Sequence, residues 1–219
     1  MIPFINHLVR FLTRFMPEKM ITVATPKYLT EAAEAIPDTA IESVRKETIR
    51  LYNNAFAIIA HGLNLHRHDI VSQRDISEII GDPRKPIPIN VDEEYERNVK
   101  GLYGDIVAFI SRAQTQMTAD QSNELFQLRT AGRDIVEAIK DTKHLNKNLS
   151  KYTLSDNQHI RNEYNKIRMH LLQVLRSLEG AKNSDEILSL DLLKVDMKSN
   201  DTTANGMLEK LIHENKISA

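Results

Sequence analysis

The sequence predicts an all-α protein, an elongated antiparallel helical bundle. Three observations support this fold class. Apolar residues recur at alternating spacings of three and four along most of the 219-residue chain, which is the period of one helical face. Glycine and proline are scarce, at seven each. No segment of useful length has the alternating pattern of a strand. Long helices at this spacing are typical of an elongated bundle whose neighbouring helices are antiparallel.

Five helices are expected in order along the chain. Four have regular apolar spacing, over residues 41–65, 95–113, 125–149 and 160–178, and a less regular fifth covers about 184–216. Capping boxes are expected where a Ser or Thr precedes a Glu or Gln by three residues, at Thr39/Glu42, Thr118/Gln121 and Ser155/Gln158, with a weaker pair at Asn183/Glu186. Gly180 is placed where a helix end favours a left-handed residue.

The connection between the first two long helices is unusually long, at about 67–90. Pro83, Pro86 and Pro88 exclude a continuous helix there. A short helix over 72–80, closed by Gly81, is expected inside it. We therefore divide the chain into a first segment and linker, 1–30, and a helical bundle, 31–219.

The first segment is apolar and basic. Residues 4–16 are rich in Phe, Leu, Ile and Met, and Arg10, Arg14 and Lys19 interrupt or follow them. The run is shorter than the roughly 20 apolar residues that span a bilayer. It is interpreted as an amphipathic helix on a membrane surface, as the cytoplasmic end of a membrane segment outside this chain, or as an ordinary helix packed on the domain. Exposed, it would favour association with a membrane or with a second copy.

Composition narrows the possible functions. The net charge of −1 gives no bulk electrostatic attraction to nucleic acid. Cysteine is absent, so disulfides, zinc–thiolate sites and thiol nucleophiles are excluded. The sequence has no glycine-rich phosphate loop, nucleophile elbow or HExxH pair. We therefore expect a protein that is not an enzyme.

The third predicted helix carries a candidate metal site. Asp134, Glu137, Asp141 and His144 follow one another at steps of three and four, so they share one helix face. Carboxylate and imidazole ligands in such a row suit iron or zinc. A solvated face would have the same pattern, and Lys143 and Lys147 are placed to neutralise the row by pairing along the helix.

Two further lines of polar residues could supply ligands from neighbouring helices. One is His159, Glu163 and His170 on the fourth helix, and the other is Glu47, Asn54 and His61 on the first. Each line also fits a polar flank or a cross-helix hydrogen bond.

Residues 133–148, RDIVEAIKDTKHLNKN, resemble the signature helix of PhoU proteins, in which a carboxylate is followed four positions later by Asp. The matching pair here is Glu137 and Asp141. The PhoU-like cytoplasmic tail of bacterial sodium/phosphate cotransporters is similar to this chain at residues 37–50 and 208–218. The link from the last membrane helix of those transporters is similar to residues 2–10 and 26–29. The order of these segments is consistent with the family. The resemblance implies iron or zinc at the carboxylate pair and the membrane domain of a phosphate transporter as partner.

The function implied is regulation of phosphate uptake or efflux at the cytoplasmic face of the inner membrane. The sequence departs from the family in two ways: the membrane helices are absent, and the chain stops at 215–219 where the family continues into another helix. A fragment or a split gene is expected from this pattern. Two other functions remain open, a free-standing PhoU-like adaptor for a phosphate sensor kinase or permease, and a metal-dependent hydrolase on a helical bundle.

Overall fold

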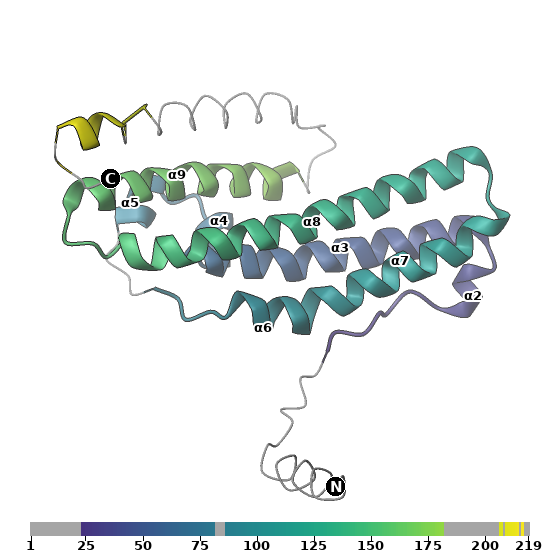
Figure 1. Cartoon of the computed structure of the whole chain (residues 1–219). Coiled ribbons are helices and arrows are strands. Elements are labelled where there is room, and N and C mark those ends of the chain that lie inside the picture. The colour runs from purple at the N-terminus through teal and green to yellow at the C-terminus, as the bar shows by residue number, and fades with distance from the viewer. Residues whose placement is uncertain (1–22, 82–85, 182–205, 208, 215, 217–219) are drawn as a thin grey trace, which may run out of the picture.

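The computed structural model describes residues 23–81, 86–181, 206–207, 209–214 and 216. Within these ranges the regular structure is helical and no strand occurs. The all-α class and the helical bundle are therefore confirmed (Figure 1). The first segment, 4–16, the Asn183/Glu186 pair and most of the predicted fifth helix lie outside the described residues, although 206–207 and 209–213 are helical.

The bundle is built on long helices with short ones in the connections. The long ones are α3 (Pro37–Gly62), α7 (Gly101–Ala113), α8 (Ala119–Tyr152) and α9 (Gln158–Ala181). The helix α6 (Val91–Tyr95) and a π-helical turn, η1 (Glu96–Lys100), precede α7 without a break. The short helices are α2 (Glu31–Glu34), α4 (Arg67–Val71) and α5 (Ile76–Gly81), with a 3₁₀ turn, η2 (Gln114–Gln116), before α8.

Helices α3, α7 and α8 form a three-helix bundle in which successive long helices alternate in direction. Near the start of α3, Asp38 accepts a hydrogen bond of 2.8 Å from Gln121 at the start of α8. Near the end of α3, Asn146 of α8 donates a hydrogen bond of 2.8 Å to the carbonyl of Gly62. The two helices are therefore parallel, and α7 runs opposite to both (Figure 1).

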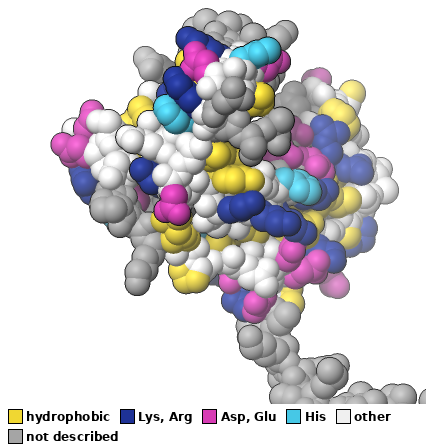
Figure 2. Space-filling view, turned by 60° about the vertical axis from the view of Figure 1, so that its left-hand side comes forward, with side chains coloured by type: hydrophobic (Ala, Val, Ile, Leu, Met, Phe, Trp, Pro, Cys, Tyr) yellow, Lys and Arg dark blue, Asp and Glu magenta, His cyan; other side chains and the backbone are white. Residues whose placement is uncertain are grey.

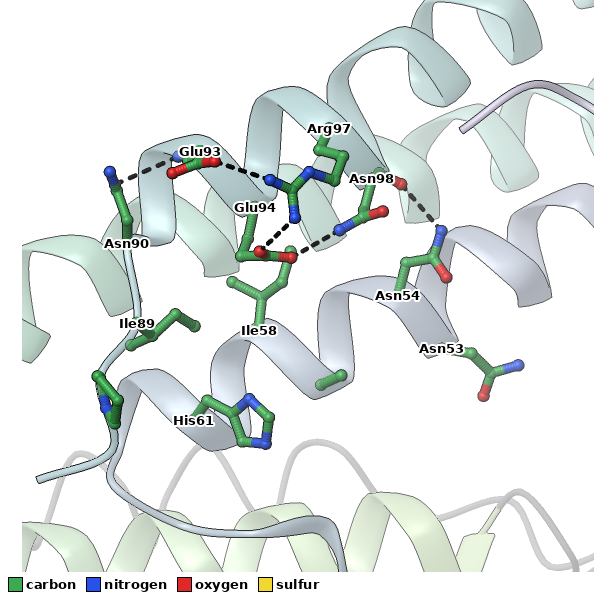
Figure 3. A pocket seen from close by; sticks show the side chains of 12 residues that line it. Asn53, Asn54, Ile58, His61, Ile89, Asn90, Glu93, Glu94, Arg97 and Asn98 are labelled. Carbon is green, nitrogen blue, oxygen red and sulfur yellow. Dashed lines mark hydrogen bonds and ion pairs between the residues drawn. The ribbon is translucent and has the colours of Figure 1, made fainter. Parts of the chain in front are cut away.

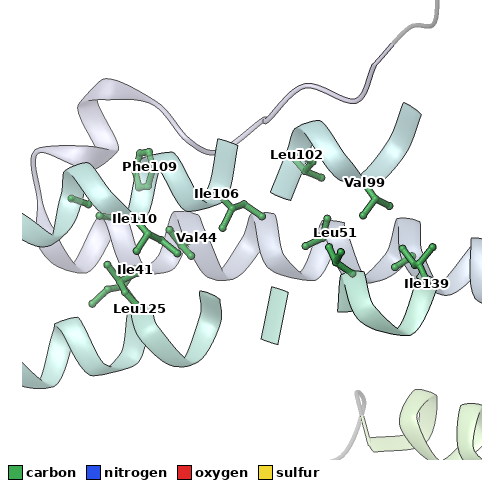
Figure 4. Packing of buried hydrophobic residues seen from close by; sticks show 14 of the residues in the cluster. Ile41, Val44, Leu51, Val99, Leu102, Ile106, Phe109, Ile110, Leu125 and Ile139 are labelled. Carbon is green, nitrogen blue, oxygen red and sulfur yellow. The ribbon is translucent and has the colours of Figure 1, made fainter. Parts of the chain in front are cut away.

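The core has two parts. The larger cluster fills the space between α3, α7 and α8, and Figure 4 shows Leu51, Ile106 and Ile139 among its members. The smaller cluster lies at the far end of α3 and joins it to α4, α5 and α9 through residues such as Phe56, Ile79 and Leu172. Each fully buried aliphatic or aromatic side chain contributes about 1.5–3 kcal/mol, so these two clusters provide the main stabilisation of the bundle.

Two arginines, of which Arg168 is buried, attach α9 to the end of α3 and to the connection that follows it. Arg168, only 5% exposed, donates to the carbonyls of Leu63 (3.2 Å) and Asn64 (3.0 Å). These carbonyls follow the last turn of α3, where helical acceptors lack partners and positive charge is favoured. Arg176 donates to the carbonyls of Asp69 and Arg74, both at 2.9 Å. The connection that follows α3 is thus fixed from the side of α9.

Three predicted helix ends were wrong. Helix α3 begins at Pro37, with Ile36 as N-cap, so Thr39 lies inside the helix, because proline is already preset for a first helical position. Helix α9 is capped by Asn157 in place of Ser155, since the Asn157 side chain accepts from the amides of His159 and Ile160. Gly180 lies within α9 and has no positive φ. The Thr118/Gln121 capping box was predicted correctly.

The long connection also differs from its prediction. One short helix was expected over 72–80, whereas α4 ends at Val71 and α5 spans Ile76–Gly81. The side chain of Asp75 accepts from the amide of Ser77, which turns the chain between the two helices. The second long helix begins at Val91, four residues before the predicted start, because the Asn90 side chain caps its first turn.

The contact between Gly62 and Thr142 gives the first testable prediction. A Cβ placed on Gly62 would lie 2.4 Å from Cγ2 of Thr142, so alanine requires Thr142 to leave its rotamer, with the hydrogen bond to Ala138, or α3 and α8 to separate. We expect Gly62→Ala to lower the free energy of unfolding by about 1–3 kcal/mol, the usual cost of overpacking.

The control removes the methyl group that causes the clash. Thr142→Ser keeps the hydroxyl that donates to the carbonyl of Ala138. Urea unfolding of the single and double variants should show that Thr142→Ser recovers most of the stability lost in Gly62→Ala. Simple additivity of the two substitutions would contradict the proposed contact.

Candidate functional site

The predicted metal-ligating row lies on the outward face of α8. Asp134, Glu137, Asp141 and His144 are all exposed, while the neighbouring Val136 and Ile139 are buried. The row is thus separated from the core, as the spacing predicted. Its members share one helix and none of them depends on a second element for its position.

Two carboxylates of the row, those of Asp134 and Glu137, form ion pairs with basic residues of the same helix. Asp134 forms an ion pair of 3.2 Å with Arg133, and Glu137 forms one of 2.7 Å with Lys140. The hydrogen bond that Lys140 donates to Glu137 raises the pKa of Lys140. Lys143, expected to neutralise the row, instead contacts Asp92 of α6 at 2.7 Å. Binding of a cation at Glu137 would therefore have to displace Lys140.

The donor set of the row fits iron or zinc in its chemistry, with two carboxylates one turn apart and an imidazole beside them. Among the described residues, however, no group of three or more His, Cys, Asp or Glu side chains is placed to hold a metal ion. Ligands for a complete site would have to come from rotation of these side chains or from another segment or copy.

The other two polar lines have local partners. Glu163 of α9 is buried and forms an ion pair of 2.7 Å with Lys166. Asn54 donates a hydrogen bond of 2.9 Å to the carbonyl of Asn98 in η1, which is the cross-helix hydrogen bond considered for this line. Glu47 is completely buried, and its partners are Arg50 on its own helix and the backbone of the segment before α2, not a neighbouring helix.

Glu47 attaches the irregular run of residues 24–28 to α3. Its Oε2 accepts from the backbone amides of Lys27 (2.8 Å) and Tyr28 (2.9 Å), and its Oε1 accepts from Arg50 at 2.6 Å. Arg50 also donates to the carbonyl of Thr25. A carboxylate with three such donors is satisfied in spite of its burial. The sequence contains a sign of this buried role, because Glu47 lies between Val44 and Leu51 on the apolar face of the helix.

A polar pocket of about 660 Å³ lies between α3 and the segment that leads into α7 (Figure 3). Asn54, Ile58 and His61 line it from α3, and the opposite wall comes from Pro88 to Asn98. Sequence reasoning had grouped Asn54 with His61, and the structure brings both to this pocket. It missed the opposite wall, which is far away in the chain.

Glu94 organises the wall of the pocket. Its carboxylate accepts from Arg97 (3.0 Å) and Asn98 (2.7 Å), and Arg97 also donates to Glu93 at 2.7 Å. On the α3 side, burial lowers the pKa of His61, and the nearby His66 lowers it further, so the imidazole is favoured in its neutral form. The π-helical turn η1 forms part of this wall, and such turns often occur at functional sites.

The face of the molecule seen in Figure 2 has mixed charge. On the face shown in Figure 2, Lys and Arg side chains lie among Asp and Glu side chains and a few apolar ones. This face has no single-sign field of the kind that attracts nucleic acid.

No helix in the described ranges is long and apolar enough to cross a membrane. Comparisons with protein families, with curated proteins and with solved structures find no match for this chain. Its function must therefore be inferred from its own residues and their geometry.

Proposed function

We propose that the chain is a PhoU-like regulatory module, without catalytic activity of its own, that associates with the membrane domain of a sodium-dependent phosphate transporter. It would lie at the cytoplasmic face of the inner membrane and modulate phosphate uptake or efflux. The sequence segments quoted above motivate the family, and the all-helical bundle is compatible with it.

One observation carries the proposal furthest, the attachment of residues 24–28 to the buried Glu47. In this proposal residues 4–16 lie against the membrane and this run is their link to the bundle. A link fixed by a buried carboxylate transmits displacement of the bundle to the membrane side, whereas a flexible one does not. Such a bundle can act by having two packing states that a bound partner or metal biases.

The proposal is tested by co-purification of the full chain with the membrane domain of a sodium/phosphate cotransporter from the same genome. We expect retention on the tagged transporter in detergent, and measurable change in phosphate flux when both are reconstituted in vesicles. A complex with a phosphate sensor kinase and none with the transporter would replace this proposal with that of a free-standing adaptor. Absence of both complexes, with and without phosphate and metal, would contradict the regulatory function.

We further propose that Glu137 and Asp141, flanked by Asp134 and His144, bind iron or zinc in this state. Replacing both Glu137 and Asp141 with alanine should abolish the bound metal, measured by elemental analysis of the purified chain. The thermal midpoint should change little, because both side chains are exposed and lie away from the core.

The matched control is Asp105→Ala with Asp120→Ala, two exposed carboxylates outside the row. This variant should retain the wild-type metal content. Full metal stoichiometry in the Glu137/Asp141 variant would show that the row is only a solvated face.

A further inference from the structure

The pocket between α3 and the α6–η1 segment has no part in the proposed regulation (Figure 3). Its volume, about 660 Å³, is in the range that small organic ligands occupy in proteins. Both of its walls are helical over most of their length, and the hydrogen bond from Asn54 to the carbonyl of Asn98 joins them. The pocket therefore has a defined shape and a defined set of polar groups.

The α6–η1 wall carries one excess negative charge. Arg97 lies between Glu93 (2.7 Å) and Glu94 (3.0 Å), so a single guanidinium compensates two carboxylates. The Glu93 and Glu94 side chains are 32% and 33% exposed, so solvent and salt screen their charges less than at an open surface. The other two acidic residues of this segment each have a basic partner outside the pocket: Asp92 pairs with Lys143, and Glu96 pairs with Lys100.

The α3 wall adds no positive charge near neutral pH. Burial lowers the pKa of His61, the nearby His66 lowers it further, and Glu94 raises it by a smaller effect. Among the residues that the structure describes, the His61 imidazole has a ring contact with His66 and no hydrogen bond. A neutral imidazole keeps one nitrogen as an acceptor. The pocket as a whole is therefore negative, which disfavours anions such as phosphate.

Two amide oxygens lie at the other end of the pocket. Asn54 uses its amide nitrogen to bond the carbonyl of Asn98, and Asn98 uses its own to bond Glu94 at 2.7 Å. Within the described ranges the Oδ1 atoms of Asn54 and Asn98 have no hydrogen-bond partner, so both remain acceptors. Ile58, between Asn54 and His61 in the helix, and Ile89 of the opposite wall add apolar lining.

The spacing of the two ends limits the length of a ligand that contacts both. Asn54 and His61 are seven residues apart on α3, a rise of about 10 Å. A hydrogen bond of about 2.9 Å at each end leaves roughly 5 Å between the polar atoms of the ligand. An amine and a hydroxyl group separated by about three carbons have this spacing.

We propose that the pocket binds a small organic amine that also carries a hydroxyl group, an amino alcohol. Its ammonium group lies between the Glu94 carboxylate and the acceptor nitrogen of His61, where it balances the excess negative charge. Its carbons lie on Ile58, and its hydroxyl group donates to the amide oxygen of Asn54 or Asn98. This inference does not depend on the proposed function, because none of these residues belongs to the metal row.

The first experiment compares three probes by NMR titration of the full chain. They are 3-aminopropan-1-ol, propane-1,3-diol and 3-hydroxypropanoate, which share a chain and a hydroxyl group and differ in whether the other end is cationic, neutral or anionic. The amine should bind at least about tenfold more tightly than the diol. The shifted backbone amides should lie in residues 54–61 and 88–98, and the hydroxy acid should shift none of them.

The second experiment changes the charge of the wall. Glu94→Gln leaves Arg97 with one carboxylate and makes the wall neutral, so amine affinity should fall about tenfold, to that of the diol. Glu96→Gln is the matched control, because Glu96 is exposed on the same segment and does not line the pocket. It makes the same change in net charge and should keep the wild-type affinity.

A third variant blocks the pocket without touching the carboxylates. Ala57→Trp fills the space from the α3 side, and it should abolish the shifts caused by the amine while the circular dichroism spectrum stays native. This variant decides the question if Glu94→Gln fails to fold. Equal affinity for the three probes, tighter binding of the hydroxy acid, or full amine binding in Ala57→Trp would overturn the proposal.

Discussion

Replacing Ile139 with aspartate is expected to unfold or severely loosen the bundle. Ile139 is 1% exposed and lies in the cluster between α3, α7 and α8 (Figure 4). The substitution removes about 1.5–3 kcal/mol of burial and places a carboxylate where no basic partner is described. We expect the free energy of unfolding to fall by about 4 kcal/mol or more, a large part of the 5–15 kcal/mol typical of a domain.

Circular dichroism with urea unfolding measures this effect, and the next residue provides the control. Lys140→Asp puts the same side chain on the same helix, but at an exposed position. It should keep the native helix content and unfold close to the wild-type midpoint. If Ile139→Asp were tolerated as well as Lys140→Asp, the orientation of α8 in the bundle would be wrong, and with it the outward placement of Glu137 and Asp141.

Apolar spacing predicted the helices better than their ends. Positions such as Leu51 and Ile139 are read directly from a period of three and four, because burial on one face is a repetitive constraint. A cap depends on one local hydrogen bond, and several residues compete for it. At α3 Pro37 set the start ahead of Thr39, and at α9 Asn157 replaced Ser155.

The two candidate sites also differ in how well the sequence predicts them. The position of Glu137 and Asp141 on one outward face follows from their spacing within a single helix, and it was predicted. The pocket requires α3 to meet a segment more than 40 positions away, as in the contact between Asn54 and Asn98. The pattern of a single sequence does not show which residues of two such distant segments lie opposite each other. The amide side chains of both walls could therefore be identified only from the three-dimensional structure.

Glu47→Ala is expected to release the run of residues 24–28 from α3. The substitution deprives the amides of Lys27 and Tyr28 of their acceptor and leaves Arg50 without its carboxylate partner on α3. Loss of one member of a buried ionic group typically costs about 3–5 kcal/mol. We expect a loss near the lower end, because Arg50 is 23% exposed and water can reach it.

The location of the amides that lose protection from hydrogen exchange shows whether the substitution releases residues 24–28 or weakens the whole bundle. Amides of residues 27–28 should exchange much faster in Glu47→Ala, whereas those in the centres of α7 and α8 should follow only the change in global stability.

Glu42→Ala is the matched control, since Glu42 lies on the same helix and pairs with Arg45 at the surface. It should leave the exchange of residues 27–28 unchanged. Because the carboxylate of Glu47 is the buried acceptor for this run, unchanged exchange in Glu47→Ala would mean that the link is held by other contacts. The connection of the first segment to the bundle would then depend on contacts such as those of Thr25 and Ala24 and not on Glu47.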